Sequence, residues 1–207
     1  MRTYDTVVIG LGGMGSAALY NLARRGQRVL GIEQFGISHD RGSSHGDTRL
    51  IRRAYFEHPD YVPLVDRAYQ LWEALEIAAS RTLLHRCGLM LAGRPHGAVI
   101  PGVQRAARQH RLAIETVAHG DWPARFPGFA PDDDMQVLFE PDAGFLEVEN
   151  CVAAHIEQAQ AYSAEILTGQ RVTSWSADAR GVTVTTDHAA YAARSLVLCG
   201  GAWTSRL

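Results

Sequence analysis

The chain has 207 residues, 46% of them hydrophobic and 20% charged, the composition of an ordinary globular protein of one domain or slightly more. The formal net charge of -2 gives no electrostatic reason to expect nucleic acid or an anionic membrane as a partner. The 3 cysteines form no CxxC pair and the 9 histidines show no metal-binding spacing, so we expect neither a disulfide framework nor a metal site. No segment has the pattern of a signal peptide or a membrane span, and we expect a cytoplasmic protein.

The first part of the chain has the pattern of a strand, a helix and a second strand. The short apolar run Thr6–Ile9 ends in glycines, which is typical of a buried parallel strand. Helix formers follow over Met14–Arg25, with Gly26 placed to end the helix, and Arg28–Glu33 predicts a second strand. Together these segments predict a βαβ unit of about 30 residues.

The glycines between the first strand and the helix form a dinucleotide-binding fingerprint. Gly10-Leu-Gly12-Gly-Met-Gly15 is a G-x-G-x-x-G in the context that the motif needs, after a strand and at the start of a helix. Gly10 permits a tight turn, Gly12 lets the backbone approach a pyrophosphate, and Gly15 lets the helix pack on the strand. The helix N-terminus, at Gly13 and Met14, then offers N–H groups to the phosphates. A glycine-rich turn without a ligand is the alternative.

An acidic residue at the end of the second strand completes the fingerprint. Glu33 lies about 20 residues after Gly15, where a carboxylate accepts hydrogen bonds from an adenosine ribose and disfavours the 2′-phosphate of NADP. NAD and FAD both use this arrangement. The later segments favour FAD, because strands over Arg171–Ser176 and Val182–Thr186 predict a meander that returns to the apolar run Leu196–Cys199 and a Gly-Gly pair. That order is typical of FAD folds related to glutathione reductase.

We therefore predict an α/β fold class: a Rossmann-like FAD-binding fold of the glutathione-reductase type with an antiparallel meander, plus part of an α+β substrate domain. The expected organisation is a first FAD-binding segment at 1–85, an inserted part of the substrate domain at 86–146, and a second FAD-binding segment at 147–207. Helical spacing of Leu64, Ala68, Leu71, Trp72 and Leu75 predicts a core-facing stripe. The further expected elements are helices over Tyr61–Ile77, Gln104–Arg111 and Cys151–Tyr162, strands over Leu112–Val117, Glu165–Thr168 and Ala189–Ala192, and a loop over Gly120–Asp134.

The segment Gly42–Tyr55 is the most unusual one in the sequence. A helix that begins at 47 or 48 would place three arginines on one side of its first two turns: Arg49, Arg52 and Arg53. Their charges would oppose one another and the helix dipole, each by a few tenths of a kcal/mol up to about 1 kcal/mol. An arrangement this unfavourable indicates a bound anion, either a cofactor phosphate or a substrate carboxylate, to which arginine donates two parallel hydrogen bonds. The alternative is a solvated basic surface with ion pairs to Asp47 or Glu57.

Three further polar residues of this segment are candidates for cofactor contacts. Ser43 and Ser44 have hydroxyl groups that suit either phosphate binding or helix capping. His45 suits either a contact with a flavin or an ordinary position in a loop, and the residues leave both interpretations open.

This segment resembles a known family. Gly42-Ser-Ser-His-Gly-Asp-Thr-Arg-Leu-Ile-Arg-Arg-Ala-Tyr55 is very similar to Gly-Ser-His-His-Gly-Asp-Thr-Arg-Ile-Ile-Arg-His-Ala-Tyr of the monomeric sarcosine oxidases and N-methyltryptophan oxidases. The resemblance runs the length of the chain and is far more specific than the glycine fingerprint. It continues in Tyr61-Val-Pro-Leu64, Leu71-Trp72, Cys87-Gly-Leu89, Phe139-Glu-Pro141, Gly144-Phe-Leu146, Glu149-Asn-Cys151 and Gly201-Ala-Trp203.

The resemblance implies an FAD enzyme that oxidises the secondary amine of an N-methyl amino acid to an imine, with O2 reduced to H2O2. It implies that Arg52 holds the substrate carboxylate, that His45 and Arg49 lie beside the flavin, and that Tyr55 lines the substrate pocket. The cofactor-binding residues expected from the fingerprint and the resemblance together are Gly10, Gly12, Gly13, Met14, Gly15, Glu33, Ser43, Ser44, Thr48, Val172, Gly200, Gly201 and Trp203.

The sequence also departs from the family. Ser44 and Arg53 each replace a histidine, and either change bears on flavin contacts or substrate choice. The family's flavin-linking cysteine and active-site lysines lie beyond the matched region, so the resemblance implies a C-terminal remainder of the same enzyme as a partner and weak FAD binding by the chain alone. The alternative functions are an amino acid dehydrogenase with another electron acceptor, a non-catalytic nucleotide-binding module, and an NAD-dependent dehydrogenase.

Overall fold

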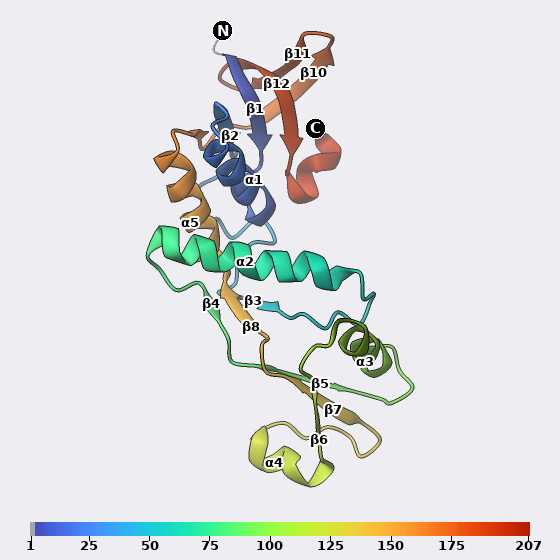
Figure 1. The fold of residues 1–207 in the computed structure, drawn as a ribbon. Helices are drawn as coiled ribbons and strands as arrows, with labels where there is room; N and C mark the ends of the chain where they lie inside the picture. Colours follow the sequence, from blue (N-terminus) through green and yellow to red (C-terminus); the bar gives the residue numbers. More distant parts are fainter. Residues whose placement is uncertain (1–2) are drawn as a thin grey trace. The chain divides into compact units, whose positions relative to one another are not determined.

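The computed structural model describes residues 3–207, which divide into two packing units (Figure 1). The first unit comprises Met1–Thr48, Ile77–Leu83 and Glu147–Leu207, and the second comprises Arg49–Glu76 and Leu84–Leu146. This division differs from the expected domain boundaries, because Arg49–Glu76 packs with the second unit rather than with the nucleotide-binding segments.

A six-stranded sheet forms the centre of the first unit. Its strand order is β10-β11-β12-β1-β2-β9, and the neighbours from β12 to β9 run parallel while β10, β11 and β12 form an antiparallel meander. The strands are β1 (Thr3–Ile9), β2 (Val29–Ile32), β9 (Glu165–Leu167), β10 (Val172–Asp178), β11 (Gly181–Thr186) and β12 (Ala190–Leu198). The predicted Rossmann-like fold with a meander is confirmed.

Apolar residues explain why these strands form the core of the first unit. Val7 and Val8 on β1 and Leu30 on β2 are completely buried, as expected of continuous apolar runs in a parallel sheet. On β11, Val184 is buried while Thr183 and Thr185 are partly exposed, so this strand has one covered face. The two strands expected over Ala189–Ala192 and Leu196–Cys199 are one continuous strand, β12, because it is paired with β11 on one side and β1 on the other.

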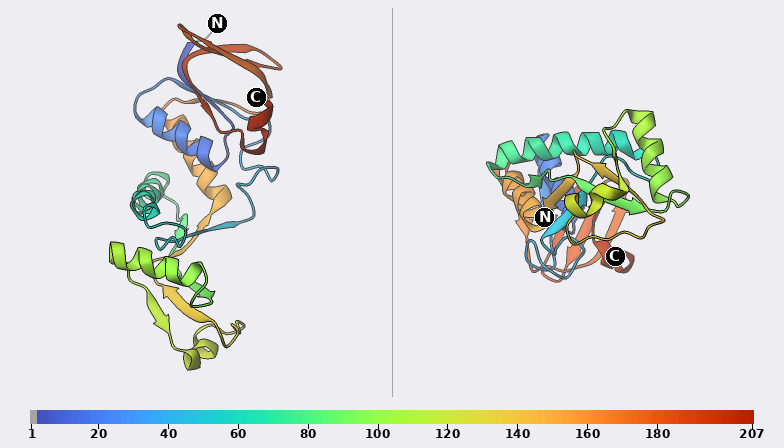
Figure 2. Two further views of the ribbon diagram at one scale, coloured as in Figure 1. Left: turned by 90° about the vertical axis from the view of Figure 1, so that its right-hand side faces the viewer. Right: turned by 90° about the horizontal axis from the view of Figure 1, so that it is seen from below.

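Helix α1 (Gly13–Arg24) packs on β1 and β2 of this sheet and against α5 (Val148–Ala161), and the two helices lie side by side in Figure 2. Leu19 of α1 and Ala159 of α5 are completely buried. The chain leaves α1 through Gly26, whose φ of 80° is favourable for glycine and whose N–H donates to a carbonyl of the last turn, as expected of a residue that ends a helix. A short 3-10 helix, η2 (Gly201–Arg206), follows β12.

The second unit contains most of two small sheets. One has the order β3-β8-β4 and the other β5-β7-β6. Buried Ala54, Ile100, Val103 and Leu138 form its main core. Its elements are β3 (Thr48–Ile51), α2 (Tyr61–Ala79), β4 (Leu84–His85), β5 (Leu89–Gly93), α3 (Val99–His110), β6 (Glu115–Val117), the 3-10 helix η1 (His119–Asp121), α4 (Trp122–Arg125), β7 (Gln136–Glu140) and β8 (Gly144–Glu147), of which Thr48, Ile77–Ala79 and Glu147 belong to the first unit.

The helix expected from 47 or 48 onward is wrong. Asp47 has a φ of 64°, which turns the chain away from a helical path, and Thr48–Ile51 is strand β3. The Asp47 carbonyl instead accepts a hydrogen bond from the Val148 N–H at 3.0 Å. The arginines of this segment therefore do not share the side of a helix, and the argument from the helix dipole does not apply.

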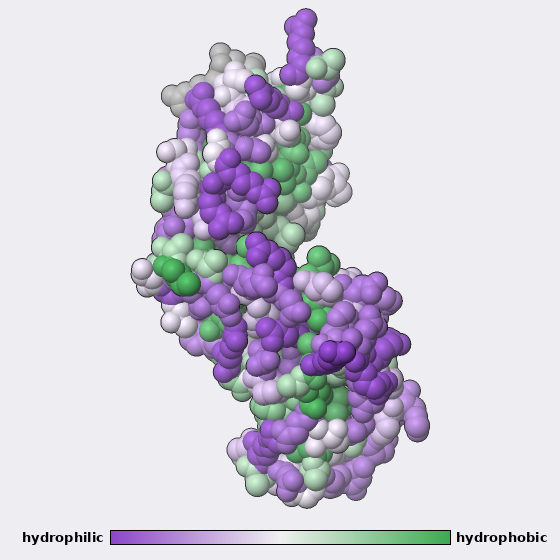
Figure 3. Space-filling view, in the orientation of Figure 1, coloured by the Kyte–Doolittle hydropathy of each residue, from purple (hydrophilic) through white to green (hydrophobic). Residues whose placement is uncertain are grey.

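The expected core stripe on α2 is also wrong in part. Leu75 is buried, but the Leu64 side chain is 68% exposed, and the buried residues of the helix include Val62 and Tyr69. Hydrophilic residues predominate on the face drawn in Figure 3, with apolar patches among them. Within residues 3–207, every helix is too short or too polar to cross a bilayer.

Candidate cofactor site

A large cavity of the first unit lies at the carboxyl ends of its parallel strands. It has a volume of about 750 Å³, within the range of about 300–1,000 Å³ that is usual for small-molecule sites. Ile9 and Ile32, the last residues of β1 and β2, both line it. In open α/β sheets, ligands bind at this edge, outside the carboxyl ends of the strands.

The glycine loop has the backbone that its sequence requires. Gly10 has a φ of 85°, and a side chain there would overlap the carbonyl group of Cys199. A Cβ on Gly15 would overlap the Gly10 carbonyl oxygen, so α1 approaches the end of β1 at backbone contact. Gly12 and Gly13 are different, because an added Cβ would meet only the Ser44 side chain, at 3.3 and 3.2 Å from its Oγ.

The Glu33 carboxylate is buried beneath this loop. Its side chain is 6% exposed, its Oε2 accepts a hydrogen bond from the Leu11 N–H at 2.9 Å, and its Oε1 accepts one from the Phe35 N–H at 3.1 Å. The His39 Nε2 lies 3.5 Å from the same Oε1. An ionised carboxylate has about four acceptor positions, so Glu33 fixes the glycine loop and retains capacity for a ribose hydroxyl.

Ser44 contacts the start of α1. Its Oγ accepts a hydrogen bond from the Gly13 N–H at 2.9 Å, at the first residue of the helix. This hydroxyl satisfies one of the N–H groups that a helix leaves without an intrahelical partner. Ser44 thus has the capping role that its residue type suggested, although for α1 rather than for a helix of its own segment.

Glu149 anchors the loop that carries Ser44. Its Oε1 accepts hydrogen bonds from the Gly46 N–H at 2.6 Å and the Asp47 N–H at 3.4 Å, and its backbone carbonyl accepts one from the Ser38 hydroxyl at 3.0 Å. Desolvation raises the pKa of this carboxyl, but those hydrogen bonds and the nearby His45 outweigh it and hold the pKa below its ordinary value. Glu149 had no predicted role, and only its place in the family-like tripeptide Glu149-Asn-Cys151 indicated it.

The structure brings most of the expected cofactor residues together. Of these residues, only Gly15 and Thr48 are outside the cavity lining, Gly15 because it packs on Gly10 and Thr48 because it begins β3. Those that line the cavity are Gly10, Gly12, Gly13, Met14, Glu33, Ser43, Ser44, Val172, Gly200, Gly201 and Trp203. Further lining residues that were not predicted include Gln34, Ser38, His39, Gln170, Arg171 and Thr173. Of these, Gln34 and Gln170 directly flank a predicted strand, and Arg171 and Thr173 lie within one.

The expected catalytic residues are outside this lining, and His45 belongs to the first unit while the others belong to the second. Arg49 lies within β3, and Arg52 follows that strand. The Arg52 guanidinium lies over the Tyr55 ring, 4.6 Å from its centroid, and its Nη2 is 3.3 Å from Glu57 Oε1. The Tyr55 ring stacks on Tyr61 at 5.3 Å. The ion pair with Glu57 is the contact that the alternative interpretation of the arginines expected.

A glycine loop at the end of the first parallel strand, a buried acid at the end of the second and a meander strand at the cavity edge define a nucleotide-cofactor-binding α/β fold. Residues 5–207 match the family described as FAD dependent oxidoreductase, and the chain belongs to that family. FAD is the cofactor of the family, which confirms the expected cofactor class over NAD.

Two groups of curated relatives are similar over almost the entire chain. A monomeric sarcosine oxidase from Streptomyces avermitilis is 44% identical over 99% of this chain, and an N-methyl-L-tryptophan oxidase from Yersinia pestis is 36% identical over 99% of it. The chain covers 53% and 55% of these proteins, so it spans about half the length of the relatives it matches. The resemblance stated from the sequence is confirmed.

A solved structure extends the similarity to the fold. NikD, an unusual amino acid oxidase essential for nikkomycin biosynthesis, superposes with a TM-score of 0.91 at 32% identity, over 100% of this chain and 53% of NikD. The L-proline dehydrogenase from P. horikoshii has a TM-score of 0.83 at 19% identity, over 99% of this chain and 54% of that protein, a likeness of fold alone.

The residues at the cavity fit FAD. Gly12 and Gly13 line the cavity at the start of α1, where the positive end of the helix dipole favours the charge of a pyrophosphate. The Gly13 N–H is itself donated to Ser44 Oγ. Glu33 also lines the cavity, and its carboxylate oxygens are of the kind that accept hydrogen bonds from ribose hydroxyls. Within residues 3–207 we find no cluster of three or more side chains able to hold a metal ion.

Proposed function

We propose that the protein containing this chain oxidises the secondary amine of an N-methyl amino acid to an imine and reduces O2 to H2O2. The observation that carries the proposal is the single cavity in which the glycine loop, Glu33 and the ends of β10 and β12 meet, in a chain 44% identical to a monomeric sarcosine oxidase. FAD, when bound, supplies the acceptor for the hydride and returns the electrons to O2.

The proposed role of the first unit is to hold the cofactor. The backbone of Gly10, Gly12 and Gly13 faces the pyrophosphate of the cofactor. Three further residues are expected to contact the cofactor: Met14, Gly15 and Thr48. Glu33 accepts the ribose hydroxyls. The remaining proposed contacts are Ser43, Ser44, Val172, Gly200, Gly201 and Trp203, with His45 beside the flavin.

The proposed role of Arg52 is to bind the substrate carboxylate. Its side chain is 20% exposed, and among residues 3–207 its buried Nε has no hydrogen-bond partner. A buried N–H without a partner is costly, and a carboxylate that engages the guanidinium fork would remove the cost. Tyr55 packs beneath the guanidinium and would line the same pocket. By its resemblance to the family, Arg49 is proposed as a flavin contact.

Three assays with the complete protein, loaded with FAD, test the function. Anaerobic mixing with sarcosine or N-methyltryptophan should bleach the flavin absorbance, and in air the same substrates should yield stoichiometric H2O2. A flavin that is reduced but returns electrons only to a dye would support a dehydrogenase instead. A flavin that none of a panel of N-methyl amino acids bleaches would contradict the proposal.

The Arg52→Ala variant tests the carboxylate site. It should raise KM for N-methyl amino acids by about 10- to 100-fold, because a charge-assisted hydrogen bond contributes about 1.5–3 kcal/mol. The matched control is Arg67→Ala, since Arg67 is an exposed arginine on α2 whose Nη1 donates a hydrogen bond to Gln70 Oε1 at 2.9 Å. An equal KM for both variants would remove Arg52 from the proposal.

A further inference from the structure

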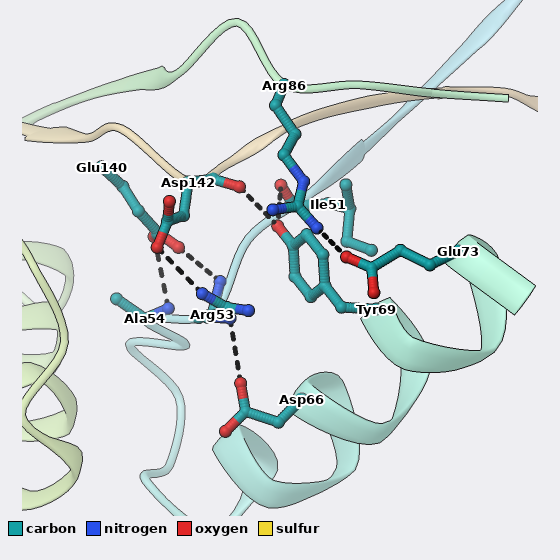
Figure 4. Close-up of polar contacts among 9 residues, drawn as sticks. All are labelled: Ile51, Arg53, Ala54, Asp66, Tyr69, Glu73, Arg86, Glu140 and Asp142. Atoms are coloured by element: carbon teal, nitrogen blue, oxygen red, sulfur yellow. Dashed lines mark hydrogen bonds and ion pairs between the residues drawn. The ribbon is translucent and has the colours of Figure 1, made fainter. Parts of the chain in front are cut away.

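Among residues 3–207, Glu140 is a buried acidic side chain with no salt bridge to an arginine. It is 2% exposed and ends strand β7. Its Oε1 accepts a hydrogen bond from the Arg53 N–H at 2.6 Å, and its Oε2 accepts one from the Ala54 N–H at 3.2 Å (Figure 4). A buried carboxylate is unfavourable unless hydrogen bonds compensate it, and here two consecutive backbone groups do so.

Burial dominates the electrostatics of this group. Desolvation raises the pKa of the Glu140 carboxyl, and the two backbone hydrogen bonds and the charges of Arg52 and Arg53 only partly oppose it. An apolar residue at this place would avoid the desolvation but would leave two backbone N–H groups without an acceptor. A carboxylate at this position is therefore explained by the hydrogen bonds that it accepts from the backbone N–H groups of residues 53 and 54.

The same short segment is held on its other side by Tyr69 of α2. The Tyr69 hydroxyl donates to the Asp142 carbonyl at 3.1 Å and more weakly to the Ile51 carbonyl at 3.4 Å, and burial raises its pKa to about 12. Its ring lies under the guanidinium of Arg53, 4.6 Å from the ring centroid. Figure 4 shows Tyr69 and Glu140 approaching this segment from different elements.

The side chain of Arg53 adds a third restraint. Its Nε lies 2.9 Å from Asp66 Oδ1 and its Nη1 lies 2.9 Å from Asp142 Oδ2. Its carbonyl accepts the Tyr55 N–H at 2.8 Å, which closes a tight turn. The backbone is thus held by hydrogen bonds at residues 51, 53 and 54. Arg52 lies between two of these held positions, and Tyr55 follows the last of them.

We propose that Glu140 is a positioning residue, whose carboxylate fixes the backbone at Arg53 and Ala54 and thereby aims Arg52 and Tyr55 at the carboxylate of the substrate. The inference rests on the proposed function, because it assigns Arg52 to substrate binding. Glu140 itself touches neither substrate nor cofactor. Its effect is exerted through the direction in which the two neighbouring side chains leave the backbone.

The test is steady-state kinetics of the FAD-loaded complete protein with the variants Glu140→Gln and Glu140→Asp. The amide keeps the size but replaces one acceptor oxygen by a donor, and the aspartate keeps the charge but withdraws it by one methylene. Both variants should raise KM for an N-methyl amino acid at least about tenfold while kcat per bound flavin changes much less. If Glu140→Gln does not fold, the KM of Glu140→Asp decides the test.

The matched control is Glu115→Gln in the same unit, where an exposed glutamate pairs with Arg125 and the same change should leave KM unaltered. A merely structural role of Glu140 predicts a lower melting temperature and less bound flavin at an unchanged KM, and this result would overturn the inference while the function stands. A wild-type protein that turns over no N-methyl amino acid would overturn the function and, with it, the inference.

Discussion

The Oγ of Ser44 accepts a hydrogen bond from the Gly13 N–H at 2.9 Å, so a loop serine caps a helix that begins 31 residues earlier in the chain. The bond ties the loop to the edge of the cavity at which a pyrophosphate would approach. Removal of this hydrogen bond therefore measures how much it contributes to stability and to the attachment of the loop.

We expect Ser44→Ala to lower the free energy of unfolding of the cofactor-free protein by about 1 kcal/mol, since the Gly13 N–H loses its acceptor. Urea denaturation followed by circular dichroism measures the change. Ser176→Ala, on an exposed position of β10, is the control and should have little effect. Equal midpoints for the two variants would mean that the cap contributes nothing.

Two glycines of one loop should respond very differently to the same substitution. Gly15→Ala places a methyl group onto the Gly10 carbonyl oxygen. Because this oxygen belongs to the backbone and cannot rotate away, the change should cost about 3 kcal/mol or more. Gly13→Ala meets only the Ser44 side chain and gains helix propensity, so its effect should be within about 1 kcal/mol. Thermal melts of both variants compare them directly, and a Gly15→Ala protein as stable as wild type would contradict the packing described for α1.

Glu33→Ala should lower both stability and FAD affinity. The Leu11 N–H would be left buried without an acceptor, which costs about 1–3 kcal/mol, and the ribose would lose its partner. Titration of the apoprotein with FAD, followed by quenching of flavin fluorescence, measures the affinity. Glu157→Ala on the exposed side of α5 is the control, and unchanged affinity in Glu33→Ala would argue against Glu33 as a cofactor contact.

The pH dependence of stability should contain a component from His155. Burial between α1 and α5 lowers its pKa from 6.5 to about 4, and a hydrogen bond to the Cys151 backbone opposes the shift only in part. The unfolded state binds the proton first, so the stability from the neutral ring is present above pH 6.5 and is lost as the pH falls toward 4. The loss should reach about 2 kcal/mol by pH 5.

Urea denaturation at pH 7 and pH 5 measures this component. His155→Phe should show a smaller drop between the two pH values than wild type. His188→Phe, which changes an exposed histidine, should keep the wild-type drop. A drop of the same size in all three proteins would assign the pH dependence to other groups.

The sequence predicted the local parts of the fold well. The strand, glycine loop, helix and second strand from β1 to β2 were placed to within a few residues, because each depends on neighbours in the chain: apolar runs, turn glycines and a glycine after the helix. The same holds for the helix expected over Cys151–Tyr162, which is α5 and buries Val152, Ile156 and Ala159 along its length.

Prediction failed where distant pairing decides the structure. Helix formers at 49–53 gave no sign that Thr48–Ile51 would pair with β8, nearly a hundred residues later, or that Asp47 would turn the chain. The strands β7 and β8 were not predicted either. For the site, residue types identified the glycines and Glu33, but only the folded chain shows that Glu140 and Glu149 hold the backbone segments from which the arginines and Ser44 extend.

The cofactor cavity has a consequence for the order of events during synthesis. Its floor comes from Ile9 and the glycine loop, whereas one wall comes from Leu198 to Leu207, and β1 is completed on one side only by pairing with β12. The ribosome delivers the glycine loop first, yet β1 lacks its neighbour β12 until residues 190–198 have emerged. Contacts of such long range form slowly, so the central strand waits with an open edge. We therefore expect FAD to bind late in folding and to stabilise the assembled sheet relative to partly folded chains.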